Sequence, residues 1–172
     1  PLCMIARVRL FATDDDLMRI SSDNPNWRFE RTADGVLTMT PPTGAASSQR
    51  NARLTHMFFE LAEAHGFVAF DSNGGFRLAD TSVVAPDASL VTQESWDNLT
   101  AKQRERFFPG APVVAVELCS DSDTPSDLKA KLERIRAAGA AYVVLIDPYR
   151  GAIWTDGVAP GGFDLDFEPF LA

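Results

Sequence analysis

The sequence has few cysteines and no long apolar run. Its two cysteines, Cys3 and Cys119, are too few for a disulfide framework and do not form a Cys-x-x-Cys zinc motif. No apolar run approaches the roughly 20 residues that a membrane-spanning helix needs. The first residues, PLCMIARVRLF, lack the basic segment and the cleavage site of a signal peptide. We therefore expect a soluble protein of the cytoplasm, with no membrane partner.

Positive charge is also scarce. The chain has 16 Lys and Arg residues against 24 Asp and Glu residues, a net charge of −8 at pH 7. It therefore lacks the broad basic surface of proteins that coat nucleic acid. A local basic groove beside an acidic metal site is compatible with this charge. The sequence also has no Gly-x-Gly-x-x-Gly motif, no Walker loop and no recognisable Ser-His-Asp arrangement.

The length of 172 residues and the hydrophobic content of 45% are typical of one globular domain. We predict a single domain over residues 1–172, with an N-terminal helix and hairpin (11–40), a core (46–155) and a C-terminal tail (156–172). A long helix is predicted from about 46 to 64. An apolar strand at 113–119, a helix ending at Gly139 and a second apolar strand at 142–147 predict a crossover with parallel strands. The expected fold class is α/β, with a central mixed sheet flanked by helices.

A carboxylate interrupts the first of these apolar strands. Strand periodicity places Glu117 on one side together with Val113, Ala115 and Cys119. A buried polar group without a hydrogen bond costs roughly 2–7 kcal/mol. Glu117 must therefore have a partner, which can be a metal ion, a cation or a hydrogen-bond donor.

The helix that follows offers a cation. At 100° per residue, Lys131 lies on the flank of the apolar stripe, whereas Lys129 lies well away from it. The stripe consists of Leu128, Leu132 and Ile135. If Asp87 comes from a neighbouring strand, two carboxylates and an ammonium group converge. Such a set suits metal-assisted hydrolysis of a phosphodiester, because Mg²⁺ prefers oxygen ligands. The same residues can equally form a purely structural salt-bridge cluster.

Other polar residues have simpler interpretations. Glu30 lies in a predicted hairpin strand, and we interpret it as a solvated strand residue. His56 and His65 are interpreted as surface or capping residues of the long helix. Arg50 falls on the apolar line of that helix, so it either extends past the core or points into a site.

Ordered pieces of the sequence from about Phe11 to Asp156 resemble the Uma family of putative restriction endonucleases, which has the PD-(D/E)xK nuclease fold. The pieces are RFERTADGVLTMTPPTG (28–44), FDSNGGFRL (70–78), APDASLV (85–91), VVAVELCSDSD (113–123), LKAKLERIRAAGA (128–140) and VVLIDPYRG (143–151). The resemblance implies a restriction-endonuclease-like fold and DNA cleavage that depends on Mg²⁺ or Mn²⁺.

The resemblance also assigns roles to single residues. The metal-binding Asp of the family falls on Asp87 and its strand Glu on Glu117, and the backbone carbonyl of Leu118 is a further metal ligand. The third motif position is Cys119 here, and the lysine of the site matches Lys131. Further candidates are Glu30, which matches a frequent acid of the family, and Arg50 and Arg77 for phosphate contacts.

The resemblance has one departure and leaves alternatives open. Related sequences often carry a Glu or a His near the start of the first long helix, where this chain has AASSQ (45–49). That departure and the net acidity favour a catalytically degenerate fold that acts as a nucleic-acid-binding or protein-interaction module. The retained Asp87, Glu117 and Lys131 favour an enzyme. The resemblance and the single-domain length also suggest a homodimer, because cleavage of both DNA strands requires two active sites.

Overall fold

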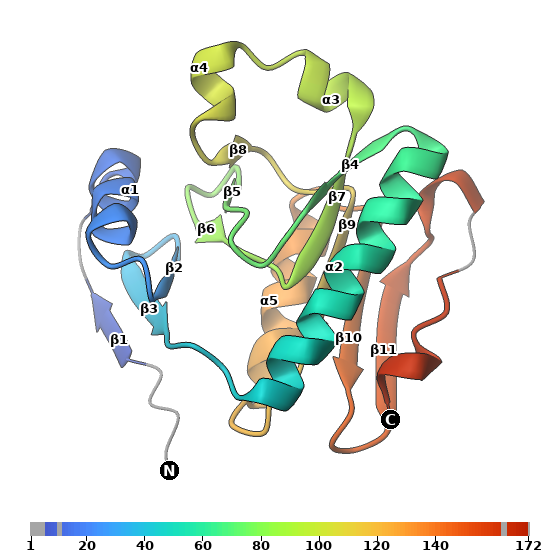
Figure 1. The fold of residues 1–172 in the computed structure, drawn as a ribbon. Coiled ribbons are helices and arrows are strands. Elements are labelled where there is room, and N and C mark those ends of the chain that lie inside the picture. The colour runs from blue at the N-terminus through green and yellow to red at the C-terminus, as the bar shows by residue number, and fades with distance from the viewer. Residues whose placement is uncertain (1–5, 10–11, 163–164, 172) are drawn as a thin grey trace.

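Two mixed β-sheets form the frame of the computed structural model, which describes residues 6–9, 12–162 and 165–171 (Figure 1). The five-stranded sheet has the order β11 (Ala152–Gly157), β10 (Tyr142–Asp147), β9 (Val114–Leu118), β7 (Ala88–Thr92), β4 (Phe67–Phe70). The six-stranded sheet has the order β1 (Ala6–Arg9), β3 (Val36–Thr40), β2 (Arg28–Arg31), β6 (Val83–Val84), β5 (Phe76–Arg77), β8 (Phe108–Pro109). The central mixed sheet is confirmed. The second sheet was not part of the prediction.

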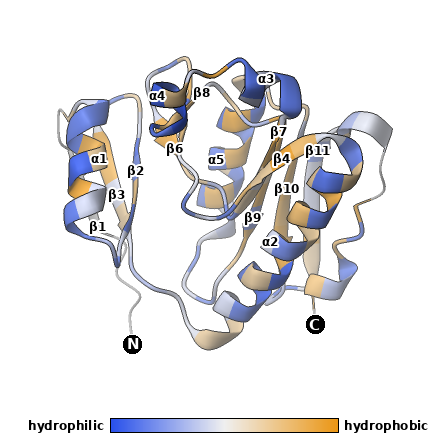
Figure 2. Ribbon diagram, turned by 45° about the horizontal axis from the view of Figure 1, so that its top comes forward, coloured by the Kyte–Doolittle hydropathy of each residue, from blue (hydrophilic) through white to orange (hydrophobic). Residues whose placement is uncertain are grey.

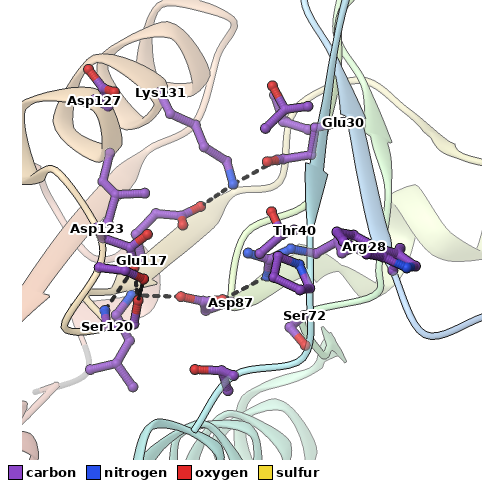
Figure 3. Close-up of a pocket in the computed structure, with 18 of the residues that line it drawn as sticks. Arg28, Glu30, Thr40, Ser72, Asp87, Glu117, Ser120, Asp123, Asp127 and Lys131 are labelled. Atoms are coloured by element: carbon purple, nitrogen blue, oxygen red, sulfur yellow. Dashed lines mark hydrogen bonds and ion pairs between the residues drawn. The ribbon is translucent and has the colours of Figure 1, made fainter. Parts of the chain in front are cut away.

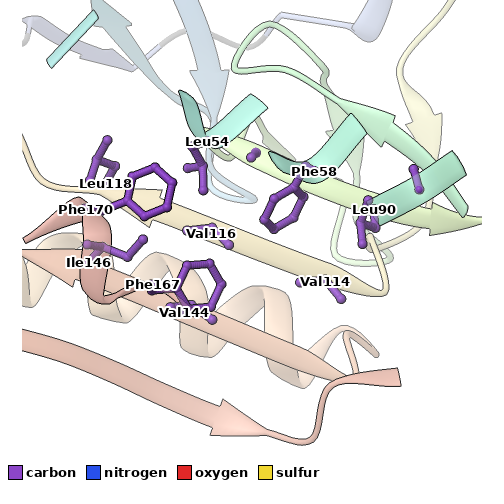
Figure 4. Packing of buried hydrophobic residues seen from close by; sticks show 12 residues of the cluster. Leu54, Phe58, Leu90, Val114, Val116, Leu118, Val144, Ile146, Phe167 and Phe170 are labelled. Carbon is purple, nitrogen blue, oxygen red and sulfur yellow. The ribbon is translucent and has the colours of Figure 1, made fainter. Parts of the chain in front are cut away.

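Two long helices cover opposite faces of the five-stranded sheet. Helix α2 (Ala45–His65) packs Leu54 and Phe58 against one face, and helix α5 (Pro125–Ala137) packs Leu132 and Ile135 against the other. Strand β9 supplies both layers, because alternate side chains point to opposite faces. Its residues Val114, Val116 and Leu118 lie in the α2 layer (Figure 4). Strands β9 and β10 are parallel, which confirms the predicted crossover through α5.

The hydropathy of the chain follows this arrangement. The strands of the five-stranded sheet are largely hydrophobic, and α2 carries hydrophilic residues along the part of its surface turned away from that sheet (Figure 2). Burying one Val, Leu, Ile or Phe side chain contributes about 1.5–3 kcal/mol. The two faces of this sheet therefore hold most of the stabilising apolar contacts, and they fix the positions of β7 and β9.

The N-terminal helix holds the β2–β3 hairpin beside this core. Thr13 and Asp16 form a capping box that starts helix α1 (Asp14–Asp23). Leu17 of α1 and Phe29 of β2 are buried in one small apolar cluster. Arg31 is buried as well, and its guanidinium group donates to Asp14 Oδ1 over 2.6 Å. These contacts fix the direction from which β2 approaches the five-stranded sheet.

The remaining helices are short. The predicted helical region at 93–108 consists of α3 (Gln93–Asp97) and α4 (Ala101–Arg104), and the 3₁₀ segments η1 (Pro160–Gly162) and η2 (Glu168–Phe170) lie in the C-terminal tail. No helix in the described part of the chain combines the length and apolarity that crossing a membrane requires. Of the two cysteines, Cys119 is buried, and Cys3 lies outside the described residues.

Candidate active site

Strand pairing brings the two candidate metal ligands side by side. Strands β7 and β9 are antiparallel, with Ala88 opposite Val116. Continuing this register by one residue places Asp87 opposite Glu117. The backbone N–H of Leu118 donates to Asp87 Oδ2 over 2.9 Å, which locks the first carboxylate against the strand of the second. Both carboxylates are buried, with exposures of 5% for Asp87 and 1% for Glu117.

The β2 strand adds a cation and a third carboxylate. Arg28 and Glu30 are two residues apart and therefore share one face of the strand. Arg28 Nη1 lies 2.8 Å from Asp87 Oδ1. Glu30 Oε1 accepts a hydrogen bond of 2.6 Å from the backbone N–H of Ala85. Glu30 is thus a member of the cluster with its side chain only 16% exposed, and its interpretation as a solvated strand residue is wrong. The reason is that the Ala85 N–H and Lys131, both distant in sequence, contact its carboxylate.

Lys131 joins the carboxylates from the other side (Figure 3). Its Nζ lies 2.6 Å from Glu117 Oε1 and 2.7 Å from Glu30 Oε1, and it donates to the carbonyl oxygen of Ala85 over 2.9 Å. The ammonium group is therefore held by one hydrogen bond to the backbone and by ion pairs with two carboxylates. Lys129 is exposed, 3.9 Å from Glu133 and stacked over the ring of Trp154. The helical phase predicted for the two lysines is confirmed.

Burial and neighbouring charges shift the pKa values of the cluster. Burial raises the pKa of Glu117 to about 8, against the opposing effect of Lys131. Burial alone would raise the pKa of Glu30, but Lys131 and Arg28 outweigh it and lower that pKa. Burial disfavours the charged form of Lys131, yet Glu117 and Glu30 outweigh it, so its pKa is raised.

The cluster forms the floor of an open cavity of about 860 Å³. The walls come from both sheets and from α2 and α5, which is why residues distant in sequence meet there. Labelled wall residues in Figure 3 include Thr40, Ser72, Ser120, Asp123 and Asp127. The buried charges therefore face a space large enough for a nucleotide-sized group.

The donor set fits a hard divalent cation that keeps part of its water shell. Two carboxylates, Asp87 and Glu117, lie on adjacent strands, and the chain continues into the carbonyl of Leu118. Mg²⁺ is commonly bound by one or two carboxylates with water and phosphate. No cluster of three or more His, Cys, Asp or Glu side chains in the described ranges could hold a metal ion.

Cys119 occupies the third motif position of the family resemblance. Its thiol is buried, and burial raises its pKa to about 12, so it is neutral and supplies no charge. The cation of the site comes from α5 instead, through Lys131.

The two predicted phosphate-binding arginines lie elsewhere. Arg50 stacks over the ring of Tyr149, and Arg77 pairs with Asp14 over 2.7 Å. Neither lines the cavity. On the buried line of α2 the polar residues are Ser47 and Asn51 rather than Arg50. Sequence reasoning missed Arg28. Its one signal was its spacing of two from Glu30, and Glu30 itself was interpreted as solvated.

The chain is similar to solved protein structures but not to any curated protein sequence. The chain is similar to the crystal structure of a putative nuclease belonging to DUF820 from Anabaena variabilis ATCC 29413, with 14% sequence identity and a TM-score of 0.67, over 85% of this chain and 79% of that chain. It is also similar to the DrdV–DNA complex solved by cryo-electron microscopy, at 15% identity over 59% of this chain and 8% of that chain, with a TM-score of 0.37 that is too low to support an argument.

The first of these structures establishes the restriction-endonuclease-like fold, and the family assignment rests on sequence. Residues 14–155 match the family Uma2, described as "Putative restriction endonuclease". The match contains α1, the β2–β3 hairpin and every residue of the buried charge cluster. The chain therefore belongs to the Uma2 family of putative restriction endonucleases.

Proposed function

We propose that this protein is an endonuclease that hydrolyses DNA phosphodiester bonds with the help of Mg²⁺ or Mn²⁺. One observation carries the proposal: a cluster of five charged residues lines an open cavity, and three of them, Asp87, Glu117 and Lys131, are buried. The other two are Arg28 and Glu30. Burying charge is costly, and a cluster with a purely structural role has no need of an adjoining cavity. Membership of the Uma2 family supports the same reaction.

Asp87, Glu117 and the backbone carbonyl of Leu118 would hold the metal. When bound, the ion lowers the pKa of a water ligand and neutralises charge that develops on the phosphate. The chain's own residues prepare the site. The Leu118 N–H keeps one oxygen of Asp87 turned toward the β9 strand, and burial keeps a proton on Glu117 until a cation replaces it.

Lys131 acts as a fixed cation and not as a general base. A base must lose its proton near neutral pH, whereas Glu117 and Glu30 raise the pKa of Lys131. Its ion pairs with Glu117 and Glu30 hold these two carboxylates in place.

Plasmid cleavage tests the proposal. We expect the parent protein to nick supercoiled DNA in Mg²⁺ or Mn²⁺ and to be inactive in EDTA. Asp87→Asn keeps the side-chain shape but removes an anionic ligand, so it should reduce cleavage at least 100-fold, equivalent to about 2.7 kcal/mol. Asp97→Asn is the matched control, since Asp97 is an exposed residue of α3 outside the cavity, and it should cleave like the parent.

The alternative is a degenerate nuclease fold that binds nucleic acid or protein without cleaving. The observation that favours it is the set of ion pairs in which Arg28 neutralises Asp87 and Lys131 lies against Glu117 and Glu30. A parent protein that binds DNA but leaves it intact in every metal would favour this alternative.

We also propose that the protein acts as a homodimer, because two copies related by a two-fold axis can present one site to each DNA strand. Light scattering at micromolar concentration should give twice the chain mass of 18.8 kDa. A mass of one chain would contradict this proposal.

A further inference from the structure

The start of α2 forms one wall of the cavity and presents polar groups to it. Thr43, Ser47 and Asn51 are spaced four residues apart, and all three line the cavity. Continuing along the same line of the helix, Leu54 and Phe58 are fully buried in the core. The line thus changes from apolar to polar where α2 leaves the sheet and borders the cavity.

The first turn of α2 is left without a cap. Gly44 is the N-cap residue and has no side chain to accept from the helix, and the first turn contains no acidic residue. Among the hydrogen bonds of the described chain, none engages the backbone N–H of Ala45, Ala46 or Ser47. Three N–H donors and the positive end of the dipole of a 21-residue helix therefore remain available.

Two polar side chains next to this turn also have donors that no partner accepts. Ser47 is only 8% exposed and lines the cavity, and its hydroxyl makes no hydrogen bond within the ranges that the structure describes. Asn51 lines the cavity one turn further along α2, and its side-chain N–H₂ group makes no hydrogen bond among those same residues. A hydroxyl and an amide N–H₂ group can both donate to an anion that enters the cavity.

Three cations of the cavity are already held by other groups. Arg28 is paired with Asp87, and Lys131 lies against Glu117 and Glu30. Arg31 donates to Asp14 and to the backbone carbonyls of Ala12 and Thr81. Arg134 also lines the cavity, so an anion there can combine this cation with the uncapped N–H donors of α2.

We propose that the first turn of α2 is the phosphate-binding subsite of this protein, formed by the N–H groups of residues 45–47, the Ser47 hydroxyl and the Asn51 amide. The ligand class is a phosphate of a nucleic-acid backbone, and this assignment rests on the proposed nuclease function. The subsite occupies the place where related sequences often carry a Glu or a His. A carboxylate there would repel phosphate, whereas the small residues of AASSQ leave the N–H groups open.

Gly44 offers a test that separates binding from folding. Its φ of −68° and ψ of 162° suit any residue, and a Cβ at this position would have no neighbouring atom within 4 Å, so an aspartate fits. Gly44→Asp should cap the helix with its own carboxylate and raise the thermal midpoint. That carboxylate should also occupy the donors and weaken binding of a phosphate at least tenfold. Gly44→Ala is the matched control without a capping group and should bind like the parent.

The measurement uses inorganic phosphate and a fluorescein-labelled DNA 16-mer, both in EDTA. In ¹H–¹⁵N spectra of the parent, phosphate should shift the amide signals of residues 45–47 saturably. By fluorescence anisotropy, Ser47→Ala should bind the 16-mer roughly three- to tenfold more weakly, as expected for one lost hydrogen bond to a charged group. Gly44→Asp should bind it still more weakly while melting at a higher temperature.

The outcomes distinguish this subsite from the nuclease proposal. If the parent cleaves DNA but Gly44→Asp binds phosphate and the 16-mer as the parent does, the subsite is wrong and the nuclease stands. If the parent never cleaves DNA but the amide shifts appear and Gly44→Asp abolishes them, the subsite stands and the nuclease does not.

Discussion

At the scale of single residues, Arg28 is the side chain that most changes how the site works. It lies 2.8 Å from Asp87 Oδ1, on an oxygen that a metal would use. The guanidinium group and the metal ion therefore compete for one carboxylate. In the metal-free protein, Arg28 supplies the positive charge that keeps Asp87 buried. A metal ion that enters must displace Arg28 or share Asp87 with it.

Arg28→Met should make the fold depend on metal. Breaking a buried ion pair leaves Asp87 without a counter-charge, which should reduce the free energy of unfolding in EDTA by roughly 3 kcal/mol. Saturating Mn²⁺ should then raise the thermal midpoint of the variant more than that of the parent, because the ion replaces the missing charge. Arg19→Met, which breaks an exposed pair with Asp16, is the control. If Mn²⁺ raised the thermal midpoints of Arg28→Met and of the parent by the same amount, Arg28 and the metal ion would not compete for Asp87.

Glu117 makes stability depend on pH in a direction that can be worked out. Its pKa is raised from 4.5 to about 8, chiefly by burial. Above pH 4.5 the unfolded chain releases this proton while the folded chain keeps it, so the stability due to this group falls as pH rises through about 8. Glu117→Gln removes the titration. In EDTA, the thermal midpoint of this variant minus that of the parent should therefore increase as the pH rises from 5 to 9.

The matched control for this pH series is Glu133→Gln, since Glu133 is an exposed residue of the neighbouring helix α5. Its thermal midpoint should stay parallel to that of the parent across the series. A constant difference between Glu117→Gln and the parent would mean that Glu117 is ionised throughout the range.

At the scale of elements, α5 shows why part of the site could be predicted. The spacing of its apolar residues fixes the phase of the helix, and the phase alone directs Lys131 to the sheet and Lys129 to water. The role of Glu117 in β9 could also be predicted, because a single carboxylate in an apolar strand requires a partner. Local periodicity thus predicted Glu117 and Lys131, their pairing and the parallel crossover that joins β9 to β10.

Substitution of the two lysines tests this phase directly. Lys131→Met keeps the apolar stem but strands Glu30, so urea unfolding in EDTA should show a loss of roughly 3 kcal/mol. Lys129→Met should change stability by no more than about 0.5 kcal/mol, as for other exposed residues. Both variants should be compared by plasmid nicking in Mn²⁺, where we expect the Lys131 variant alone to be inactive. A nicking-competent Lys131→Met protein would contradict its role.

The hairpin itself was predicted, but its contacts with the site and the polar part of the α2 line were not. Arg28 and Glu30 are held by Asp87, Ala85 and Lys131, and the contact from Arg28 to Asp87 spans 59 residues. The periodicity of β2 does not reveal which element covers it. On α2, the apolar line was correctly placed, but its polar continuation runs through Ser47 and Asn51. Arg50 turns instead to Tyr149.

At the scale of the whole molecule, the site exists because two sheets and two helices meet around one cavity. β7 and β9 bring Asp87 and Glu117, β2 brings Arg28 and Glu30, α5 brings Lys131, and α2 brings its uncapped first turn. The six-stranded sheet was absent from the prediction, because strands of two residues, such as β5, β6 and β8, have too little periodicity to show which strands they pair with. The fold was predicted from the family resemblance, whereas the ion pairs of Arg28 and Glu30 were found only in the structure.

The central claim is that Asp87 and Glu117 together bind a divalent metal ion, and diffraction from a crystal soaked in Mn²⁺ tests it most directly. The account predicts one anomalous peak per chain, in contact with the carboxylates of both residues, with Arg28 turned away from Asp87. The Asp87→Asn protein soaked in the same way should lack the peak. A parent crystal without a peak there, in which Arg28 still binds Asp87 and Lys131 still binds Glu117, would contradict the claim and identify the cluster as structural.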